Sequence, residues 1–180
     1  MPSEGVNKVE LVLGGARSGK SRYAEGVASA SCKPVVYIAT SEVRDDEMAK
    51  RVQLHQQQRP KQWTVVEEPY GLADALRKHS HADNCVLVDC LTLWLSNSLF
   101  GQSQQAWTDI RQDFLQALLE VSGQVLLVSN EVGCGVVPMG KETRQFVDEA
   151  GWLHQAIAQQ VAKVTLVTAG LPMTLKGGES

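Results

Sequence analysis

Residues 11–21 read L-V-L-G-G-A-R-S-G-K-S, and this stretch decides the fold of the chain. An apolar β-like run over residues 9–13 leads into the spacing G-x-x-x-x-G-K-S, typical of a phosphate-binding loop between a strand and a helix. The glycines bring backbone N–H groups against phosphate oxygens, and the N-terminal end of the following helix attracts the same anion. In this motif Lys20 would reach the β- and γ-phosphates, and the Ser21 hydroxyl would bind Mg²⁺. We therefore expect a nucleotide-binding loop; the alternative is a chance glycine-rich turn.

Short apolar runs recur along the chain without alternating polar residues, which is typical of strands buried on both faces of a parallel sheet. The expected strands cover residues 9–13, 35–39, 86–88, 125–128 and 164–167, with a further short strand at 63–66 and an edge strand at 171–176. Helical patterns cover residues 20–30, 45–58, 70–80, 104–121 and 141–162. This alternation predicts one α/β domain over residues 1–180, a mostly parallel sheet with helices on both faces.

The composition is that of an ordinary globular domain, with 43% hydrophobic and 21% charged residues in 180. A net charge of −3 argues against a surface that coats nucleic acid. The four cysteines and four histidines show no zinc-site spacing, so the cysteines are expected to be reduced thiols. We find neither a basic-then-apolar signal pattern nor an apolar run of membrane length, and expect a cytoplasmic protein with no membrane span.

Polar side chains follow several of the expected strands, where ligands bind in open α/β sheets. The residues at these strand ends are Ala39, Thr40, Ser41, Asp89, Ser129, Asn130 and Glu131, of which all but Ala39 have polar side chains. For Asp89 we favour a metal-side carboxylate, because a phosphate loop needs one. The alternative is that Asp89 caps a helix beginning near Leu91.

The segment 45–60 predicts a helix that stops at Pro60 and carries His55 between two arginines. Arg51 lies four residues before His55 and Arg59 four after, so the three side chains can meet on one helix face. Two guanidinium groups would favour a neutral, nucleophilic imidazole and would bind a phosphate that it attacked. From the pattern alone we favour the alternative, a histidine satisfied at a helix end beside two solvated arginines.

Other polar residues give weaker signals. Glu131, in a glycine-punctuated loop, could orient a ribose, water or metal, or could simply cap a turn. Glu67 and Glu68 follow the short strand at 63–66, and the pattern alone favours a solvated charge pair. We assign no role to His154.

Several motifs together resemble one family, the bifunctional adenosylcobinamide kinase/adenosylcobinamide-phosphate guanylyltransferases of cobalamin biosynthesis. The resemblance extends from residue 9 to about residue 176 and is far more specific than the phosphate loop alone. The motifs are G-G-A-R-S-G-K-S at 14–21, Y-I-A-T-S at 37–41, D-D-E-M at 45–48, R-V-Q-L-H-Q-Q-Q-R-P at 51–60 and N-E-V-G-C-G-V-V-P at 130–138.

The resemblance implies a RecA-like P-loop NTPase fold, a homotrimer and a set of site residues. It implies that His55 is the residue that becomes guanylylated, which reverses the preference from the pattern alone. It implies that Lys20 is catalytic, and that Ser21 and Asp89 face the metal. The implied nucleotide-binding residues are Gly14, Gly15, Ala16, Arg17, Ser18, Gly19, Lys20, Ser21, Ala39, Thr40, Ser41, Gln56, Gln57, Gln58, Arg59, Glu67 and Asp89.

The implied reaction has two halves. ATP or GTP first phosphorylates the hydroxyl of adenosylcobinamide, with Mg²⁺ and Lys20 stabilising the transferring group. His55 then attacks the α-phosphate of GTP, holds GMP covalently and passes it to the substrate phosphate, which gives adenosylcobinamide-GDP. The chain departs from the family pattern at Asp89, where some members have Glu, and at His154, where Asn is usual.

Three rival functions remain. A monofunctional P-loop small-molecule kinase would have the same loop but no covalent GMP. A regulatory GTPase would carry the N-K-x-D motif, which this sequence lacks. A RecA-like ATPase acting on nucleic acid would need a basic stripe, and the acidic balance argues against one.

Overall fold

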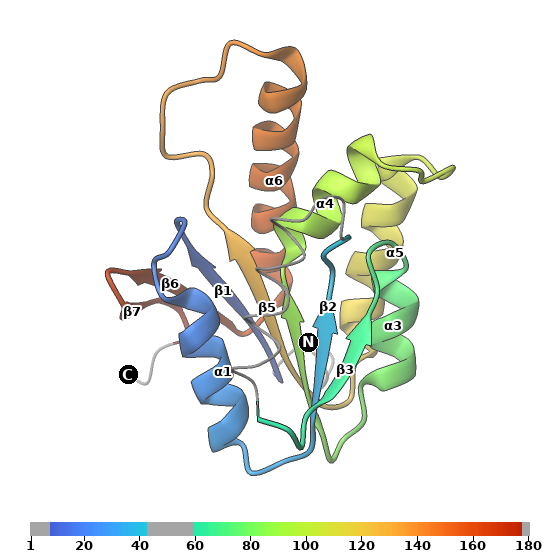
Figure 1. Ribbon diagram of the computed structural model, residues 1–180, viewed down its shortest axis with the longest axis vertical. Helices are drawn as coiled ribbons and strands as arrows, with labels where there is room; N and C mark the ends of the chain where they lie inside the picture. Colours follow the sequence, from blue (N-terminus) through green and yellow to red (C-terminus); the bar gives the residue numbers. More distant parts are fainter. Residues whose placement is uncertain (1–7, 43–59, 178–180) are drawn as a thin grey trace.

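The computed structural model describes residues 8–42 and 60–177, and its centre is a seven-stranded sheet (Figure 1). The strand order is β3-β2-β4-β5-β1-β6-β7; β1 to β6 pair in parallel and β7 runs antiparallel to β6. The strands are β1 Val9–Gly14, β2 Val35–Ala39, β3 Thr64–Glu67, β4 Cys85–Asp89, β5 Gln124–Asn130, β6 Lys163–Thr168 and β7 Leu171–Lys176. The predicted mostly parallel sheet and its edge strand at residues 171–176 are confirmed, and the structure shows that this edge strand is antiparallel.

Helices cover both faces of this sheet, as predicted (Figure 1). The described helices are α1 Lys20–Ala30, α3 Leu72–His79, α4 Leu91–Phe100, α5 Trp107–Glu120 and α6 Lys141–Gln160. The helix expected over residues 45–58, including His55, lies outside the described residues. The sequence predicts α4 only in the alternative that Asp89 caps a helix beginning near Leu91. Its polar residues do not form a separate helical face.

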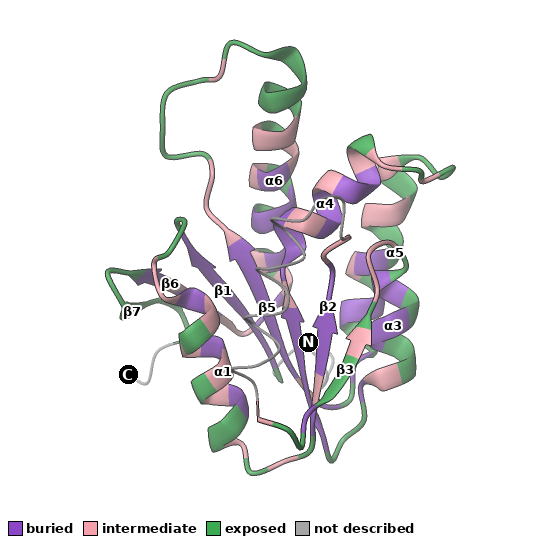
Figure 2. Ribbon diagram, viewed as in Figure 1, coloured by how far each residue is buried: buried purple, intermediate pink, exposed green. Residues whose placement is uncertain are grey.

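Two apolar cores lie on opposite faces of the sheet, and each uses alternate residues of the strands. Because both faces are covered, the central strands are buried along their length (Figure 2). Leu87, Leu126 and Val128 belong to the core that contains Ala24 and Ala28 of α1. The neighbouring strand residues join the other core, beneath α3, α4, α5 and α6, where Trp94, Phe114 and Leu153 are buried.

This alternation also fixes where the last side chain of each strand points. Asp89 follows the parity of Leu87 and lies on the α1 face, where the Tyr37 hydroxyl donates to it; Asn130 ends β5, and its carboxamide donates to Thr92 at the start of α4. Ser129 has the opposite parity and lies on the α6 face, where it contacts His154.

Candidate nucleotide-binding site

The loop between β1 and α1 has the closed shape that the G-x-x-x-x-G-K-S spacing predicts. The backbone of Arg17 has φ 55° and that of Gly19 has φ 95°, both in the left-handed region that reverses the chain direction. The Ser18 amide donates to the Gly15 carbonyl at 3.3 Å. The Lys20 ammonium also donates to the Gly15 carbonyl, at 3.0 Å, and Lys20 is buried.

Gly14 leaves no room for a larger residue. A Cβ built there would lie 2.3 Å from Ser18 Oγ and 2.6 Å from the Val167 carbonyl oxygen. The loop is also held from the side, because the amide of Gly170, in the turn between β6 and β7, donates to the Ser18 carbonyl at 2.8 Å. The loop is therefore braced by β6 before any ligand binds.

The first turn of α1 is suited to an anion. Its N-cap residue is Gly19, no side chain caps it, and no acidic residue lies in the first turn. The first N–H groups of a helix have no partner within the helix, and the helix dipole adds partial positive charge there. With the Lys20 ammonium beside them, these groups can bind phosphate oxygens.

Asp89 lies at the end of β4 on the same face as α1. The Tyr37 hydroxyl donates to Asp89 Oδ2 at 3.0 Å and thereby orients the carboxylate. The alternative that Asp89 caps α4 is wrong, because the cap position is Cys90 and no side chain bonds there. Among residues 8–42 and 60–177, no group of three or more His, Cys, Asp or Glu could hold a metal. A carboxylate and a hydroxyl instead suit Mg²⁺, which keeps waters and substrate phosphates as its other ligands.

The residues Ala39, Thr40 and Ser41 follow β2, and the register aligns Ala39 with both Glu67 and Asp89. Three strand ends therefore lie side by side. Thr40 is fully buried: its hydroxyl donates to the Cys90 carbonyl at 2.6 Å and accepts from the Cys90 amide at 2.9 Å. The Thr40 side chain thus joins β2 to β4 in this structure.

The two acids after β3 have different environments, which the sequence pattern did not separate. Glu67 ends β3 and is exposed. Glu68 Oε1 accepts from the backbone amides of Tyr70 at 3.1 Å and Gly71 at 2.8 Å, so it closes the turn before α3. The prediction of a solvated pair is wrong for Glu68; the P-Y-G sequence that follows is the turn signal that could have identified it.

Strand β5 continues two residues beyond its predicted end, to Asn130. Ser129 is fully buried and shares a hydrogen bond of 2.7 Å with the buried His154. Burial lowers the pKa of His154, and the Glu131 carboxylate partly opposes that shift. The Glu131 side chain accepts from the Gly133 amide at 2.6 Å, so it caps a turn, as the structural alternative predicted.

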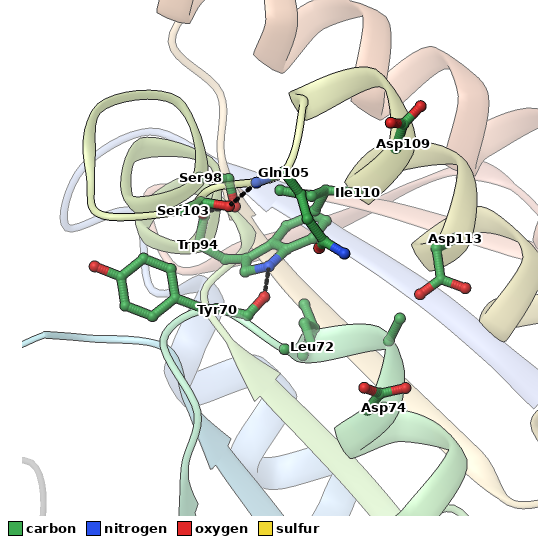
Figure 3. A pocket seen from close by; sticks show the side chains of 12 residues that line it. Tyr70, Leu72, Asp74, Trp94, Ser98, Ser103, Gln105, Asp109, Ile110 and Asp113 are labelled. Atoms are coloured by element: carbon green, nitrogen blue, oxygen red, sulfur yellow. Dashed lines mark hydrogen bonds between the residues drawn. The ribbon is translucent and has the colours of Figure 1, made fainter.

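A separate cleft of about 330 Å³ lies between α3, α4 and α5 (Figure 3). The Trp94 indole forms one wall, and its N–H donates to the Tyr70 carbonyl at 2.8 Å. Asp74, Asp109 and Asp113 also line it. Three carboxylates repel phosphate, and no residue of the phosphate loop lines the cleft, so it is distinct from the loop region.

The described geometry brings together the loop, the start of α1, Asp89 and the ends of β2 and β3. The predicted site residues His55, Gln56, Gln57, Gln58 and Arg59 lie outside the described residues. The braced loop, the buried lysine and the uncapped α1 terminus at the carboxyl edge of a parallel sheet define a P-loop nucleotide-binding protein.

Comparison with known proteins identifies the family. Residues 10–175 match the family model described as cobinamide kinase / cobinamide phosphate guanyltransferase. The bifunctional adenosylcobalamin biosynthesis protein CobP of Pseudomonas aeruginosa is 52% identical, with 93% of this chain and 97% of that protein covered. CobU of Escherichia coli is 37% identical, with 92% and 98% covered. The chain therefore belongs to the cobinamide kinase/cobinamide phosphate guanylyltransferase family.

Solved structures agree on the fold alone. The RadB recombinase has a TM-score of 0.52 at 14% identity, with 92% of this chain and 75% of that chain covered. A protein of Pyrococcus horikoshii OT3 has a TM-score of 0.59 at 11% identity, with 97% and 89% covered. Among the described helices, none is long and apolar enough to cross a membrane.

Proposed function

We propose that this chain is a single domain that phosphorylates adenosylcobinamide with ATP or GTP and then transfers GMP from GTP to the product. The observation that carries the proposal is the preformed loop with Lys20 buried against it, in a chain of this family. In the first half, the substrate hydroxyl oxygen attacks the γ-phosphorus and the nucleoside diphosphate leaves. Lys20 and the loop amides stabilise the negative charge on the transferring group.

Mg²⁺ would be held by the Ser21 hydroxyl and by Asp89, directly or through water, and would neutralise charge on the β- and γ-phosphates. Asp89 is suited to this role because Tyr37 fixes its orientation on the face of α1. Ser21 is suited because it is the second residue of α1, directly after Lys20.

The second half uses His55 as the nucleophile. Its imidazole nitrogen attacks the α-phosphorus of GTP, pyrophosphate leaves, and the substrate phosphate then takes the GMP from the imidazole. Gln56, Gln57, Gln58 and Arg59 would contact this nucleotide together with Ala39, Ser41 and Glu67, as the family resemblance implies.

We further propose that the enzyme is a cytoplasmic homotrimer that binds no nucleic acid. Val136 and Met139 support an assembly, because their side chains are 96% and 97% exposed on the segment between β5 and α6, which stands away from the sheet (Figure 1). Apolar side chains so exposed are often covered by another protein surface.

Mass spectrometry of the protein after GTP treatment tests the proposal. We expect a GMP adduct on one histidine, lost in His55→Ala while some cobinamide phosphorylation remains. Lys20→Ala should lose both activities, whereas His81→Ala, a change at an exposed histidine, should keep both. An adduct that persists in His55→Ala would refute the nucleophile. Phosphorylation by the wild-type protein with no adduct would identify a monofunctional kinase.

A further inference from the structure

The ends of β2 and β3 form a part of the carboxyl edge that lies well away from the phosphate loop. Two strands, β5 and β4, separate β1 from β2, and β3 lies beyond β2. At the usual spacing of neighbouring strands, β2 is about 14 Å and β3 about 19 Å from β1. Ser41 and Glu67, at these two ends, are both accessible to solvent. A nucleotide that contacts them must extend along the edge, with its outer phosphates at the loop.

One buried side chain joins the two strand ends. Asn97, on α4, is only 4% exposed, and its Nδ2 donates to the Thr40 carbonyl at 2.9 Å and to the Pro69 carbonyl at 3.1 Å. Thr40 directly follows β2, and Pro69 follows the end of β3. A carboxamide nitrogen carries two hydrogens, one for each carbonyl. Asn97 therefore sets the separation between the chain leaving β2 and the chain leaving β3.

Ser41 lies between two anchored residues. On one side, the Thr40 carbonyl accepts the hydrogen bond from Asn97. On the other side, Glu42 Oε2 accepts from the Tyr70 hydroxyl at 3.1 Å, and Tyr70 belongs to the turn between β3 and α3. Because both anchors connect to the chain around the end of β3, a change at either one moves Ser41 relative to that strand.

Attachment of α4 to the turn before α3 does not by itself require Asn97. Trp94, one turn earlier on α4, already donates its indole N–H to the Tyr70 carbonyl at 2.8 Å (Figure 3). An apolar side chain of similar size at position 97 would pack in the same space without placing a carboxamide in a buried site. What Asn97 adds is the hydrogen bond to Thr40, which links the β2 end to the same turn.

We propose that Asn97 is a positioning residue of the nucleotide site: it holds the ends of β2 and β3 at the separation at which Ser41 and Glu67 contact the nucleoside part of GTP. The inference rests on the proposed function, in which these two residues contact the nucleotide. Asn97 is buried and acts only through the two backbone segments that it joins. A site already held in its bound geometry loses less conformational freedom on binding, which strengthens affinity.

The test uses two variants of Asn97 and a matched control. Asn97→Leu is similar in size and removes both donors, and Asn97→Asp keeps the shape and also removes them. Asn84→Leu is the control, because Asn84 is likewise buried and its Nδ2 donates to a backbone carbonyl, that of His79, at 2.7 Å. Asn84 directly precedes β4, so this control lies at the amino edge of the sheet, opposite the site.

Two ligands separate the nucleoside contacts from the phosphate contacts. Calorimetry with Mg²⁺ gives the Kd of a GTP analogue with a methylene group between the α- and β-phosphorus, and the Kd of inorganic tripolyphosphate, which has no nucleoside. Each protein is measured at a temperature at which circular dichroism shows it to be folded. The KM for GTP in adduct formation is measured alongside.

We expect the Kd of the GTP analogue to rise about tenfold or more in Asn97→Leu and in Asn97→Asp, because the nucleoside contacts are no longer preorganised. The Kd of tripolyphosphate should stay within about threefold of the wild-type value, since the loop and Lys20 lie on β1 and α1. The KM for GTP should rise with the Kd of the analogue. Asn84→Leu should lower Tm and leave both Kd values within about threefold.

An unchanged Kd for the analogue in folded Asn97→Leu would overturn the inference. So would equal weakening of the analogue and tripolyphosphate, or the same result for Asn84→Leu as for Asn97→Leu, because each indicates a general structural role. If Asn97→Leu does not fold, the isosteric Asn97→Asp decides. A wild-type protein that forms no GMP adduct would refute the proposed transferase, and the ratio of the two Kd values would still test the role of Asn97.

Discussion

The buried pair Ser129 and His154 predicts a stability that falls as the solution is acidified. Ser129 is fully buried on β5, His154 is buried on α6, and 2.7 Å separates Ser129 Oγ from His154 Nε2. The serine oxygen can accept as well as donate, so protonation of the ring does not itself abolish the hydrogen bond. The unfavourable change is the placement of a positive charge in a desolvated site, which lowers the pKa of His154 despite the nearby Glu131 carboxylate.

The sign of the pH effect follows from this shift. In the unfolded chain His154 has an ordinary pKa of about 6.5, whereas the folded protein holds it lower. Between those two pKa values the unfolded state binds more protons, so the free energy of unfolding rises with pH. The stabilisation is complete above about pH 6.5 and is lost as pH falls toward the folded pKa.

The size of the hydrogen-bond contribution is tested by Ser129→Ala, which leaves the buried His154 nitrogen without its partner. An unsatisfied buried group costs about 1–3 kcal/mol. For a chain of this length, about 1 kcal/mol corresponds to about 2–4 °C in Tm, so we expect Tm to fall by about 2–12 °C at neutral pH.

Thermal unfolding followed by circular dichroism from about pH 7.5 to 5.5 measures both effects. Other groups contribute to the pH dependence, including His79, whose pKa burial also lowers. The informative quantity is therefore the difference between wild type and His154→Asn, with His81→Asn as an exposed control. His154→Asn should flatten the loss of Tm on acidification. A pH dependence identical in wild type and His154→Asn would refute the argument.

Two further substitutions test contacts of β1: the close packing at Gly14 and the ion pair between Glu10 and Lys163. Gly14→Ala places a Cβ 2.6 Å from the Val167 carbonyl oxygen and 2.3 Å from Ser18 Oγ, so the loop must move; we expect nucleotide affinity, measured by calorimetry, to fall about tenfold or more, equivalent to about 1.4 kcal/mol. Unchanged affinity would show that the loop adapts. Glu10→Gln removes a buried carboxylate that lies 3.3 Å from the Lys163 ammonium, and we expect urea denaturation to show a loss of about 1–3 kcal/mol. Burial lowers the pKa of Lys163, and Glu10 and Tyr23 together raise it above its ordinary value. In Glu10→Gln this pKa should fall, and a pKa equal to that of the wild-type protein would contradict the pairing.

The sheet could be predicted from the sequence because its strands are buried on both faces. Continuous apolar runs such as residues 35–39 and 164–167 appear in the structure as β2 and β6. Helix α4 was harder, since Trp94 and Leu95 are both fully buried and its sequence lacks a polar stripe. A helix in which polar residues such as Thr92, Asn97 and Ser98 are buried beside apolar ones has no clear period to detect.

The site was predictable only where local sequence determines local geometry. The phosphate loop closes through contacts among residues a few positions apart, such as Lys20 and Gly15, so its spacing is sufficient to identify it. Thr40 and Cys90 are 50 positions apart, and nothing in either segment shows that the Thr40 hydroxyl is used by the Cys90 backbone. Such pairs depend on strand order and register, which apolar runs alone do not specify.

The strand order has a consequence that no single motif contains. Because β5 lies between β1 and β4, the two strands that lead into the loop and into Asp89 are not neighbours in the sheet, and the end of β5 lies between their ends. Asn130 ends this strand, and the preceding Ser129 side chain lies on the α6 face, toward His154. One strand thus contacts the start of α4 through Asn130 and anchors α6 through Ser129. A change in the register of β5 by one residue would move both side chains and would disturb both contacts at once.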